Sequence, residues 1–136
     1  MSGFFTPRMF LIVGGAVLLL LGIVGLLNIF TEEAFPAFWL DGGENVAHLV
    51  LGAVALAAVF VPGLNSALAP YYRPIVILVG LIALFFGIYG FVVAGDTSGA
   101  NTFGLANLET ADNILHLVVA AWAFASAFMG RETSMA

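Results

Sequence analysis

The sequence predicts an all-α integral membrane protein, a four-helix bundle built from two duplicated transmembrane hairpins. The first reason is composition, because the 136-residue chain is 62% hydrophobic and only 8% charged, whereas about 25% of the residues of a soluble domain are charged. The second reason is that four apolar segments have membrane-spanning length. The third is that the first two of these segments resemble the last two in sequence.

Helices are expected over residues 9–30, 45–61, 75–94 and 113–129. A bilayer core about 30 Å thick requires about 20 apolar residues in a helix, and the first and third segments meet this requirement without a charged residue. The second and fourth segments are near the lower limit of about 17 residues. We therefore interpret residues 1–136 as a single transmembrane domain.

The segments that flank these helices have their own signals. Residues 61–72 are expected to form a loop, because Pro62 and Pro70 are helix breakers. Tyr71 and Tyr72 at the end of this loop are expected to lie at the membrane interface. The first apolar segment is longer than the roughly 7–15 residues of a signal-peptide core, and no A-x-A cleavage site follows it, so we expect it to be retained.

The two halves of the chain repeat each other as units 8–61 and 73–129. Four residues of the first unit recur 65 positions later: Arg8, Gly15, Gly22 and Gly25 become Arg73, Gly80, Gly87 and Gly90. In the second part of each unit the offset is 68 residues, and Glu44-Asn45-Val-Ala-His48 matches Asp112-Asn113-Ile-Leu-His116. A tandem duplication of one hairpin predicts a pseudo-two-fold axis along the membrane normal.

Charge predicts the orientation of the four spans. The three arginines, Arg8, Arg73 and Arg131, then lie on one side of the membrane. Seven acidic residues lie on the other side: Glu32, Glu33, Asp41, Glu44, Asp96, Glu109 and Asp112. By the positive-inside rule we expect a multi-pass protein of the cell inner (plasma) membrane with both termini in the cytoplasm.

Composition also narrows the function. The chain has no cysteine, which excludes disulfides, thiolate metal sites and iron–sulfur clusters. A formal net charge of −5 with three basic residues argues against nucleic acid as a partner. We find no phosphate loop and no nucleophile elbow, and the middles of the apolar segments carry few polar side chains, so neither an enzyme nor a channel is expected.

The Asn-x-x-His pairs are the strongest candidates for function. Asn45 and His48 are one helical turn apart and share a face, as do Asn113 and His116. The acidic residue before each pair would be stabilised at a helix N-terminus. The free N–H groups of such a helix could be capped by Asn45, Asn113 or Thr110. Each histidine is then about one turn below the outer surface, and both lie at the same depth.

Three interpretations of these histidines stay open. In the first, a neutral histidine hydrogen-bonds a loop carbonyl or its partner asparagine and holds the loop to the bundle. In the second, His48 and His116 bind the metal of heme b or of a chlorophyll-type pigment, with Asn45 or Asn113 fixing the tautomer. In the third, they carry protons together with Glu44, Asp112 or Asp96. A zinc site is less favoured, because two histidines without cysteine supply too few ligands.

Glycines on the first and third segments form one smooth face in each half. Gly15 and Gly22, like Gly80 and Gly87, are seven residues apart and therefore lie on one face of a helix. Small residues let helix backbones approach closely in lipid. We interpret these faces as helix-packing surfaces, and the alternative is that they receive a flat ligand such as a tetrapyrrole or a carotenoid.

The second half contains a stretch that resembles a known family. Residues Phe103-Gly-Leu-Ala-Asn107 and Asp112-Asn-Ile-Leu-His116-Leu-Val resemble the signature of the DUF4383-type bacterial membrane proteins. Those are small four-span proteins of unknown function in which an Asn-x-x-His element opens a late helix. The chain departs from that pattern at Ala120, where a glycine often stands. The resemblance implies the topology and says little about activity.

Together, these features predict a non-enzymatic membrane protein. We expect an accessory or scaffold subunit that packs in a larger membrane assembly, with the lipid bilayer, other membrane protein subunits or further copies of itself as partners. The alternative is a membrane protein that binds a tetrapyrrole, heme b or a chlorophyll-type pigment, through its histidines.

Overall fold

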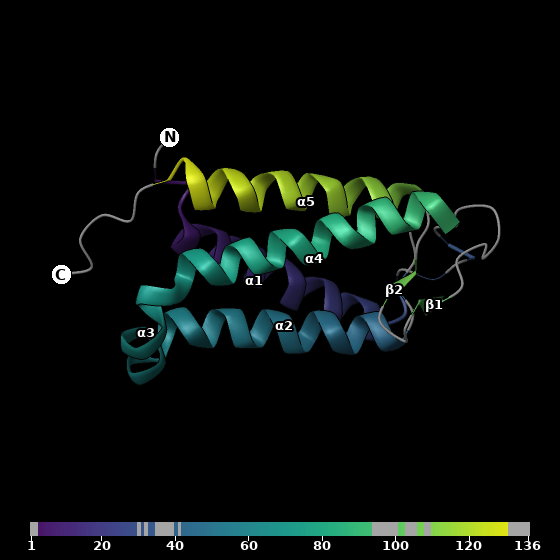
Figure 1. Ribbon diagram of the computed structural model, residues 1–136. Coiled ribbons are helices and arrows are strands. Elements are labelled where there is room, and N and C mark those ends of the chain that lie inside the picture. Colours follow the sequence, from purple (N-terminus) through teal and green to yellow (C-terminus); the bar gives the residue numbers. More distant parts are fainter. Residues whose placement is uncertain are drawn as a thin grey trace.

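The computed structural model describes residues 3–29, 31, 33–34, 40, 42–93, 101–102, 106–107 and 110–130. Four long helices lie side by side in it: α1 (Pro7–Leu26), α2 (Gly42–Phe60), α4 (Tyr72–Val93) and α5 (Thr110–Phe128) (Figure 1). A short helix α3 (Pro62–Leu68) and a 3-10 turn η1 (Ala69–Tyr71) connect α2 to α4. Strands β1 (Asn101–Thr102) and β2 (Ala106–Asn107) form an antiparallel pair before α5, and β2 lies beside α2.

The prediction of four helices with membrane-spanning length is confirmed. Four helical segments of the described chain are long and apolar enough to cross a membrane: Pro7–Leu26, Gly42–Phe60, Pro62–Val92 and Ala111–Phe128. The third of these includes α3 and η1 and has 31 residues. The 20 residues of α1 correspond to a length of about 30 Å, which equals the hydrocarbon thickness of a bilayer.

The ends of α1 show which residues define it. Thr6 caps the helix, because its hydroxyl accepts a hydrogen bond from the backbone N–H of Met9 at 3.1 Å. Pro7 occupies the first turn, where its missing N–H has no intrahelical partner to lose. The helix ends at Leu26 and not at residue 30, because Asn28 adopts a φ of 58°. Asparagine tolerates this left-handed conformation, which stops a helix.

The prediction of a loop over residues 61–72 is wrong, because this segment is helical. Pro62 lies in the first turn of α3 and Pro70 in the first turn of η1. A proline in the first turn of a helix does not break it, because the N–H that proline lacks would have no partner within the helix there. Tyr72 is 1% exposed and packs inside the chain, whereas Tyr71 is 59% exposed.

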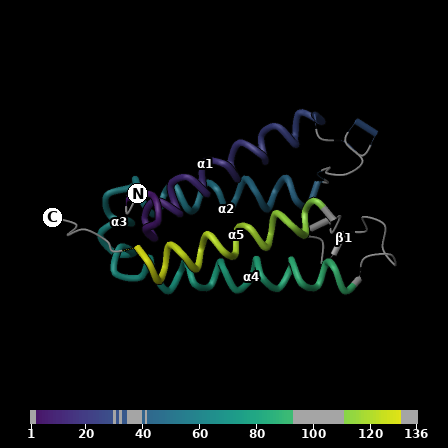
Figure 2. The backbone as a smooth tube through the Cα atoms, turned by 90° about the horizontal axis from the view of Figure 1, so that it is seen from above, coloured from purple at the N-terminus to yellow at the C-terminus, as the bar shows by residue number. Residues whose placement is uncertain are grey.

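The four long helices form two hairpins. We call α1 with α2 the first hairpin and α4 with α5 the second hairpin, because each helix packs most extensively on its partner within the pair. Contacts between the hairpins come mainly from α1, which touches α4 and α5. The hairpins meet at the end where α1 and α4 begin, and they diverge towards the end where α2 and α5 begin (Figure 1; Figure 2).

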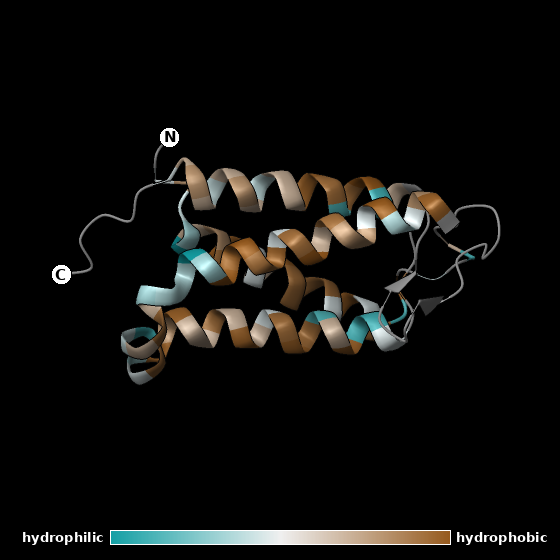
Figure 3. Cartoon of the chain, in the orientation of Figure 1, coloured by the Kyte–Doolittle hydropathy of each residue, from teal (hydrophilic) through white to brown (hydrophobic). Residues whose placement is uncertain are grey.

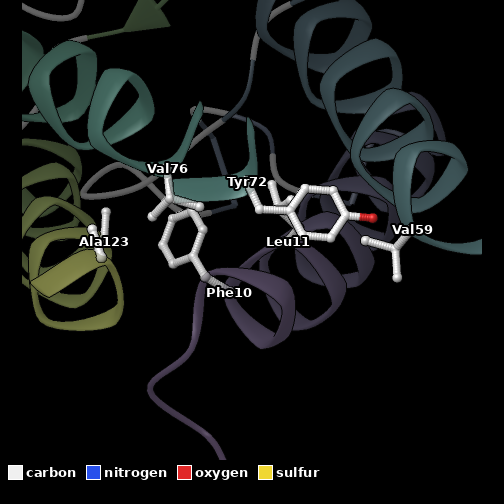
Figure 4. Packing of buried hydrophobic residues seen from close by; sticks show 7 residues of the cluster. Phe10, Leu11, Val59, Tyr72, Val76 and Ala123 are labelled. Carbon is white, nitrogen blue, oxygen red and sulfur yellow. The ribbon is translucent and has the colours of Figure 1, made fainter. Parts of the chain in front are cut away.

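A buried apolar cluster joins the hairpins at the end where they meet. Tyr72 lies between Leu11 and Val59, and Phe10 reaches towards Val76 (Figure 4). The Tyr72 hydroxyl donates to the backbone oxygen of Ala58 at 2.9 Å and also lies 2.6 Å from Asn65 Oδ1. All of the large helices contribute to this cluster, whose members are Phe10, Leu11, Val59, Tyr72, Val76, Ala123 and Ala127.

Charged residues are segregated to the two ends of the bundle. Arg8 and Arg73 lie in the first turns of α1 and α4, and Glu44 and Asp112 lie in the first turns of α2 and α5. The hydropathy colouring of the chain shows apolar helix middles between more polar ends (Figure 3). Other residues used to predict the orientation lie outside the described residues: Glu32, Asp41, Asp96, Glu109 and Arg131.

Candidate functional site

The two Asn-x-x-His elements occupy the same position in helices of the same length. Helices α2 and α5 have 19 residues each, and His48 and His116 are each the seventh residue. At about 1.5 Å per residue, each histidine is about 9 Å along the axis from the first residue of its helix. Both helices begin at the same end of the bundle (Figure 1), so both histidines lie near that end.

The asparagines lie in the seam between the two helices of each hairpin. Asn45 and Asn113 are 4% and 0% exposed, and each is the fourth residue of its helix. The capping role predicted for them is therefore wrong, because both helices start three residues earlier. A methyl group added at Gly25 would collide with the amide of Asn45, and one added at Gly90 would collide with the amide of Asn113. The asparagines thus fill the space that each glycine leaves.

The buried amides have unused hydrogen-bonding capacity. Oδ1 and Nδ2 of Asn113 and Oδ1 of Asn45 are buried and have no hydrogen-bond partner among the described residues. Leaving a buried polar group without a partner costs about 1–3 kcal/mol. The predicted hydrogen bond between Asn113 and His116 is therefore absent from the described part of the chain, and the amide oxygen faces the backbone of Gly90.

The glycine faces are occupied by the partner helix of the same hairpin. A methyl group added at Gly22 would lie 2.6 Å from Leu49 Cγ, and one added at Gly87 would lie 2.6 Å from Leu117 Cδ2. Leu49 and Leu117 occupy matching places, since they are 68 residues apart. These contacts support the packing interpretation of the glycine faces and leave no room on them for a flat ligand.

His116 is held by an acidic residue one turn earlier in α5. Its Nδ1 lies 3.2 Å from Oδ2 of Asp112. The Asp112 side chain is 8% exposed and that of His116 is 26% exposed. Nδ1 itself is buried, so the exposed part of the side chain is formed by its other atoms. The carboxylate is in the first turn of the helix, where the free N–H groups and the macrodipole stabilise a negative charge.

The equivalent residues of α2 are also buried. Glu44 is 3% exposed, and Nδ1 of His48 is buried. Both acidic residues, Glu44 and Asp112, are therefore packed inside the chain and are not solvated side chains. Sequence spacing does place an acid four residues before each histidine, which is the signal that predicts a contact of this kind.

A group of aromatic side chains on α4 contacts His116 through one member, Phe86. The His116 ring is 5.7 Å from the ring of Phe86, with an interplanar angle of 32°. Phe85 packs edge-on against Phe86 at 5.4 Å and stacks on Tyr89 at 5.5 Å. Comparing the two repeat units reveals this group, because the first unit has aliphatic residues in these places.

The described residues contain no group of three or more His, Cys, Asp or Glu side chains that could hold a metal ion. Within that part of the chain, the Asp112–His116 pair offers a metal one imidazole nitrogen, Nε2, since Nδ1 faces the carboxylate. Such a site suits a metal ion whose other coordination positions are filled by a ligand that is not part of the protein. It does not suit structural zinc, which requires four protein ligands.

Comparison of the chain with protein family models, with curated proteins and with solved structures finds no match. The resemblance to the DUF4383-type proteins stays a prediction.

Proposed function

We propose that this protein is a non-enzymatic integral membrane protein that serves as an accessory or scaffold subunit, packing against other helices of a larger membrane assembly or against copies of itself. One observation carries this proposal. Only 28% of the residues in the most apolar window of three candidate spans, and 33% in that of the fourth, are buried inside the chain. Most of each helix surface is thus available to lipid or to other helices.

The internal packing supports the same proposal. The small residues that let helices approach closely in lipid are used inside each hairpin, where Gly22 and Gly25 meet α2 and Gly87 and Gly90 meet α5. The helices of each hairpin are therefore packed closely on each other, and the two hairpins are joined at one end. Their outward faces carry large apolar side chains such as Val54 and Val118, which are 61% and 58% exposed.

A photocrosslinking experiment tests the scaffold proposal. A benzophenone amino acid is introduced at Val54 or Val118, and at Val76 as a control, because Val76 is 0% exposed. After irradiation in native membranes, at least one outward position should give a discrete protein adduct, either with one partner subunit or with a second copy. The proposal is wrong if both outward positions crosslink only to lipid.

The arrangement of charges supports a location in the cell inner (plasma) membrane. It also supports an orientation in which both termini lie in the cytoplasm. Arg8 and Arg73 begin α1 and α4, although a cation is unfavourable at a helix N-terminus. Helix stability does not explain this placement, whereas the positive-inside rule does. Arg73 also donates to the backbone oxygen of Gly130 at 3.5 Å, just after the end of α5, where the helix dipole favours a cation.

Cysteine accessibility tests this orientation, because the chain has no native cysteine. The variant Ala34→Cys places a thiol in the segment between α1 and α2, and Ser66→Cys places one in α3 at the opposite end. In intact spheroplasts, a membrane-impermeant maleimide should label the first variant and should label the second only after permeabilisation. The reverse pattern would exclude cytoplasmic termini.

A second candidate function is tetrapyrrole binding, with heme b or a chlorophyll-type pigment as the ligand. The contact between Asp112 and His116 favours it, since a carboxylate on one ring nitrogen is the usual support for a histidine that binds a metal through the other nitrogen. The test is the visible absorption spectrum of the protein after purification in mild detergent. A purified protein that has no Soret or Qy band, and that does not shift the Soret band of added heme b, would exclude it.

A further inference from the structure

We infer that tetrapyrrole binding, the second candidate function on which this inference rests, is a property of the second hairpin alone. The site consists of Nε2 of His116 as the single protein ligand to the metal, with Asp112 behind the imidazole and the aromatic side chains of α4 beside it. One metallo-tetrapyrrole binds per chain, and His48 does not participate.

One ring nitrogen of His116 is closed to a ligand. Nδ1 is buried and lies 3.2 Å from Oδ2 of Asp112, although the two atoms do not form a hydrogen bond. The side chain as a whole is 26% accessible. Nε2 is therefore the ring nitrogen that remains for a metal, and a neutral imidazole nitrogen is the usual histidine ligand.

The surface beside His116 is aromatic. Phe86 lies 5.7 Å from the His116 ring, and Phe85 and Tyr89 form a stacked pair on the neighbouring turn of α4. Phe85 is 50% exposed, so part of this aromatic surface is open to a ligand. Aromatic faces pack well against a flat conjugated ring. A small lipid with a hydroxyl group would hydrogen-bond the His116 nitrogen but would make little contact with these aromatic faces.

The two histidines differ in what lies beside them. In the first hairpin, the positions 65 residues before the three aromatic residues are Leu20, Leu21 and Val24, which offer no aromatic face to a ligand near His48. Helices α2 and α5 do not form a packed pair, because each packs on the other helix of its own hairpin. The aromatic surface therefore distinguishes His116 from His48.

The test is a titration of the full-length protein in dodecylmaltoside with iron protoporphyrin IX, followed by absorption spectroscopy. We expect saturation at one equivalent per chain and a shifted Soret band that reports coordination by one imidazole. The metal-free protoporphyrin IX serves as a ligand control, because it keeps the flat ring but has no centre for Nε2 to bind. It should bind at least about ten times more weakly if coordination fixes the affinity.

Three variants complete the test. His116→Gly should lose the Soret shift, and added imidazole should restore it, which shows that the variant is folded and lacks only the ligand. Asp112→Asn should weaken binding about 10- to 100-fold, as removal of a supporting partner behind a metal ligand does. His48→Ala should keep one equivalent and an unchanged spectrum.

The outcomes separate this inference from the functions on which it depends. Loss of binding in His48→Ala, two equivalents per chain, or equal affinity for the metal-free ring would overturn the inference while leaving tetrapyrrole binding in place. No binding of heme to the parent protein would overturn both, and the photocrosslinking result for the scaffold would be unaffected.

Discussion

The first and second hairpins share the contacts that hold their helices together, but they differ in what surrounds their histidines. Gly25 meets Asn45 in the first hairpin as Gly90 meets Asn113 in the second. The His48 and His116 positions within their helices are also identical. Around His116, however, α4 supplies Phe86 and its aromatic neighbours, while the first hairpin has aliphatic residues there.

The seams themselves differ at one level. A methyl group added at Gly52 would lie 2.5 Å from the backbone nitrogen of Leu19 and 2.7 Å from the backbone oxygen of Gly15. The corresponding residue of the second hairpin, Ala120, carries a methyl group and is 2% exposed. The helices of the first hairpin therefore cross more closely in the middle. Residues in the seams are restricted by backbone contact, whereas residues on the outward faces were free to diverge.

The largest expected effect is that of Gly52→Ala. The added methyl group meets backbone atoms of α1, which cannot move aside as a flexible side chain can, so the helices must separate. We expect the free energy of unfolding in detergent micelles to fall by about 3 kcal/mol, the upper part of the range for overpacking. Thermal unfolding followed by circular dichroism measures this loss.

The matched control for Gly52→Ala is Ala120→Gly. It removes a methyl group from the second hairpin and introduces glycine into a helix, which costs about 0.5–1 kcal/mol, but it creates no clash. Equal destabilisation by the two variants would mean that the two seams are equally close, contrary to the structure.

A smaller effect is expected at the glycines that face the asparagines. Gly25→Ala and Gly90→Ala should each destabilise the protein by about 1–2 kcal/mol, because the new methyl group meets the amides of Asn45 and Asn113, which are side-chain atoms and can shift. The clash disappears in the double variants with Asn45→Ala and Asn113→Ala. Double-mutant cycles should therefore give similar favourable couplings of about 0.5–2 kcal/mol in both hairpins. A coupling in one hairpin only would show that the two seams are not equivalent.

Much of the fold follows from the sequence, because membrane spans depend on length and apolar content. The four helices of membrane-spanning length, and the placement of both histidines near one end of the bundle, are predicted from these properties. The ends of the helices are less predictable, since they depend on single residues. Asn28 ends α1 through its left-handed conformation, and Pro62 starts a helix where a breaker is expected.

The candidate site is only partly predictable, because its contacts join residues distant in sequence. The spacing of Asp112 and His116 predicts a shared helix face, and the structure adds their 3.2 Å contact. The approach of Phe86 to His116 depends on how α4 crosses α5, which a pattern of residue types does not specify. The same is true of the cluster in which Phe10 and Tyr72 join the hairpins.

The joint between the hairpins provides the next prediction. Tyr72→Phe removes the hydrogen bond from α4 to the backbone oxygen of Ala58 in α2, together with the contact to Asn65. We expect a loss of about 1 kcal/mol in the free energy of unfolding. Its neighbour provides a matched control, because Tyr71 is 59% exposed and Tyr71→Phe should leave stability unchanged. If the two variants behave alike, the hydrogen bond does not help to join the hairpins.

The sharpest test of the comparison comes from transferring the aromatic residues to the first hairpin. Leu20 is 61% exposed, whereas Leu21 and Val24 are half-buried, so a triple variant of Leu20→Phe, Leu21→Phe and Val24→Tyr changes one outward position and two partly covered positions. If the aromatic face decides which histidine binds a metallo-tetrapyrrole, this variant should bind a second equivalent of iron protoporphyrin IX through His48. If it still binds one equivalent, the difference between the hairpins lies in how each acidic residue holds its imidazole, and exchanging Glu44 for Asp in the same variant distinguishes that cause.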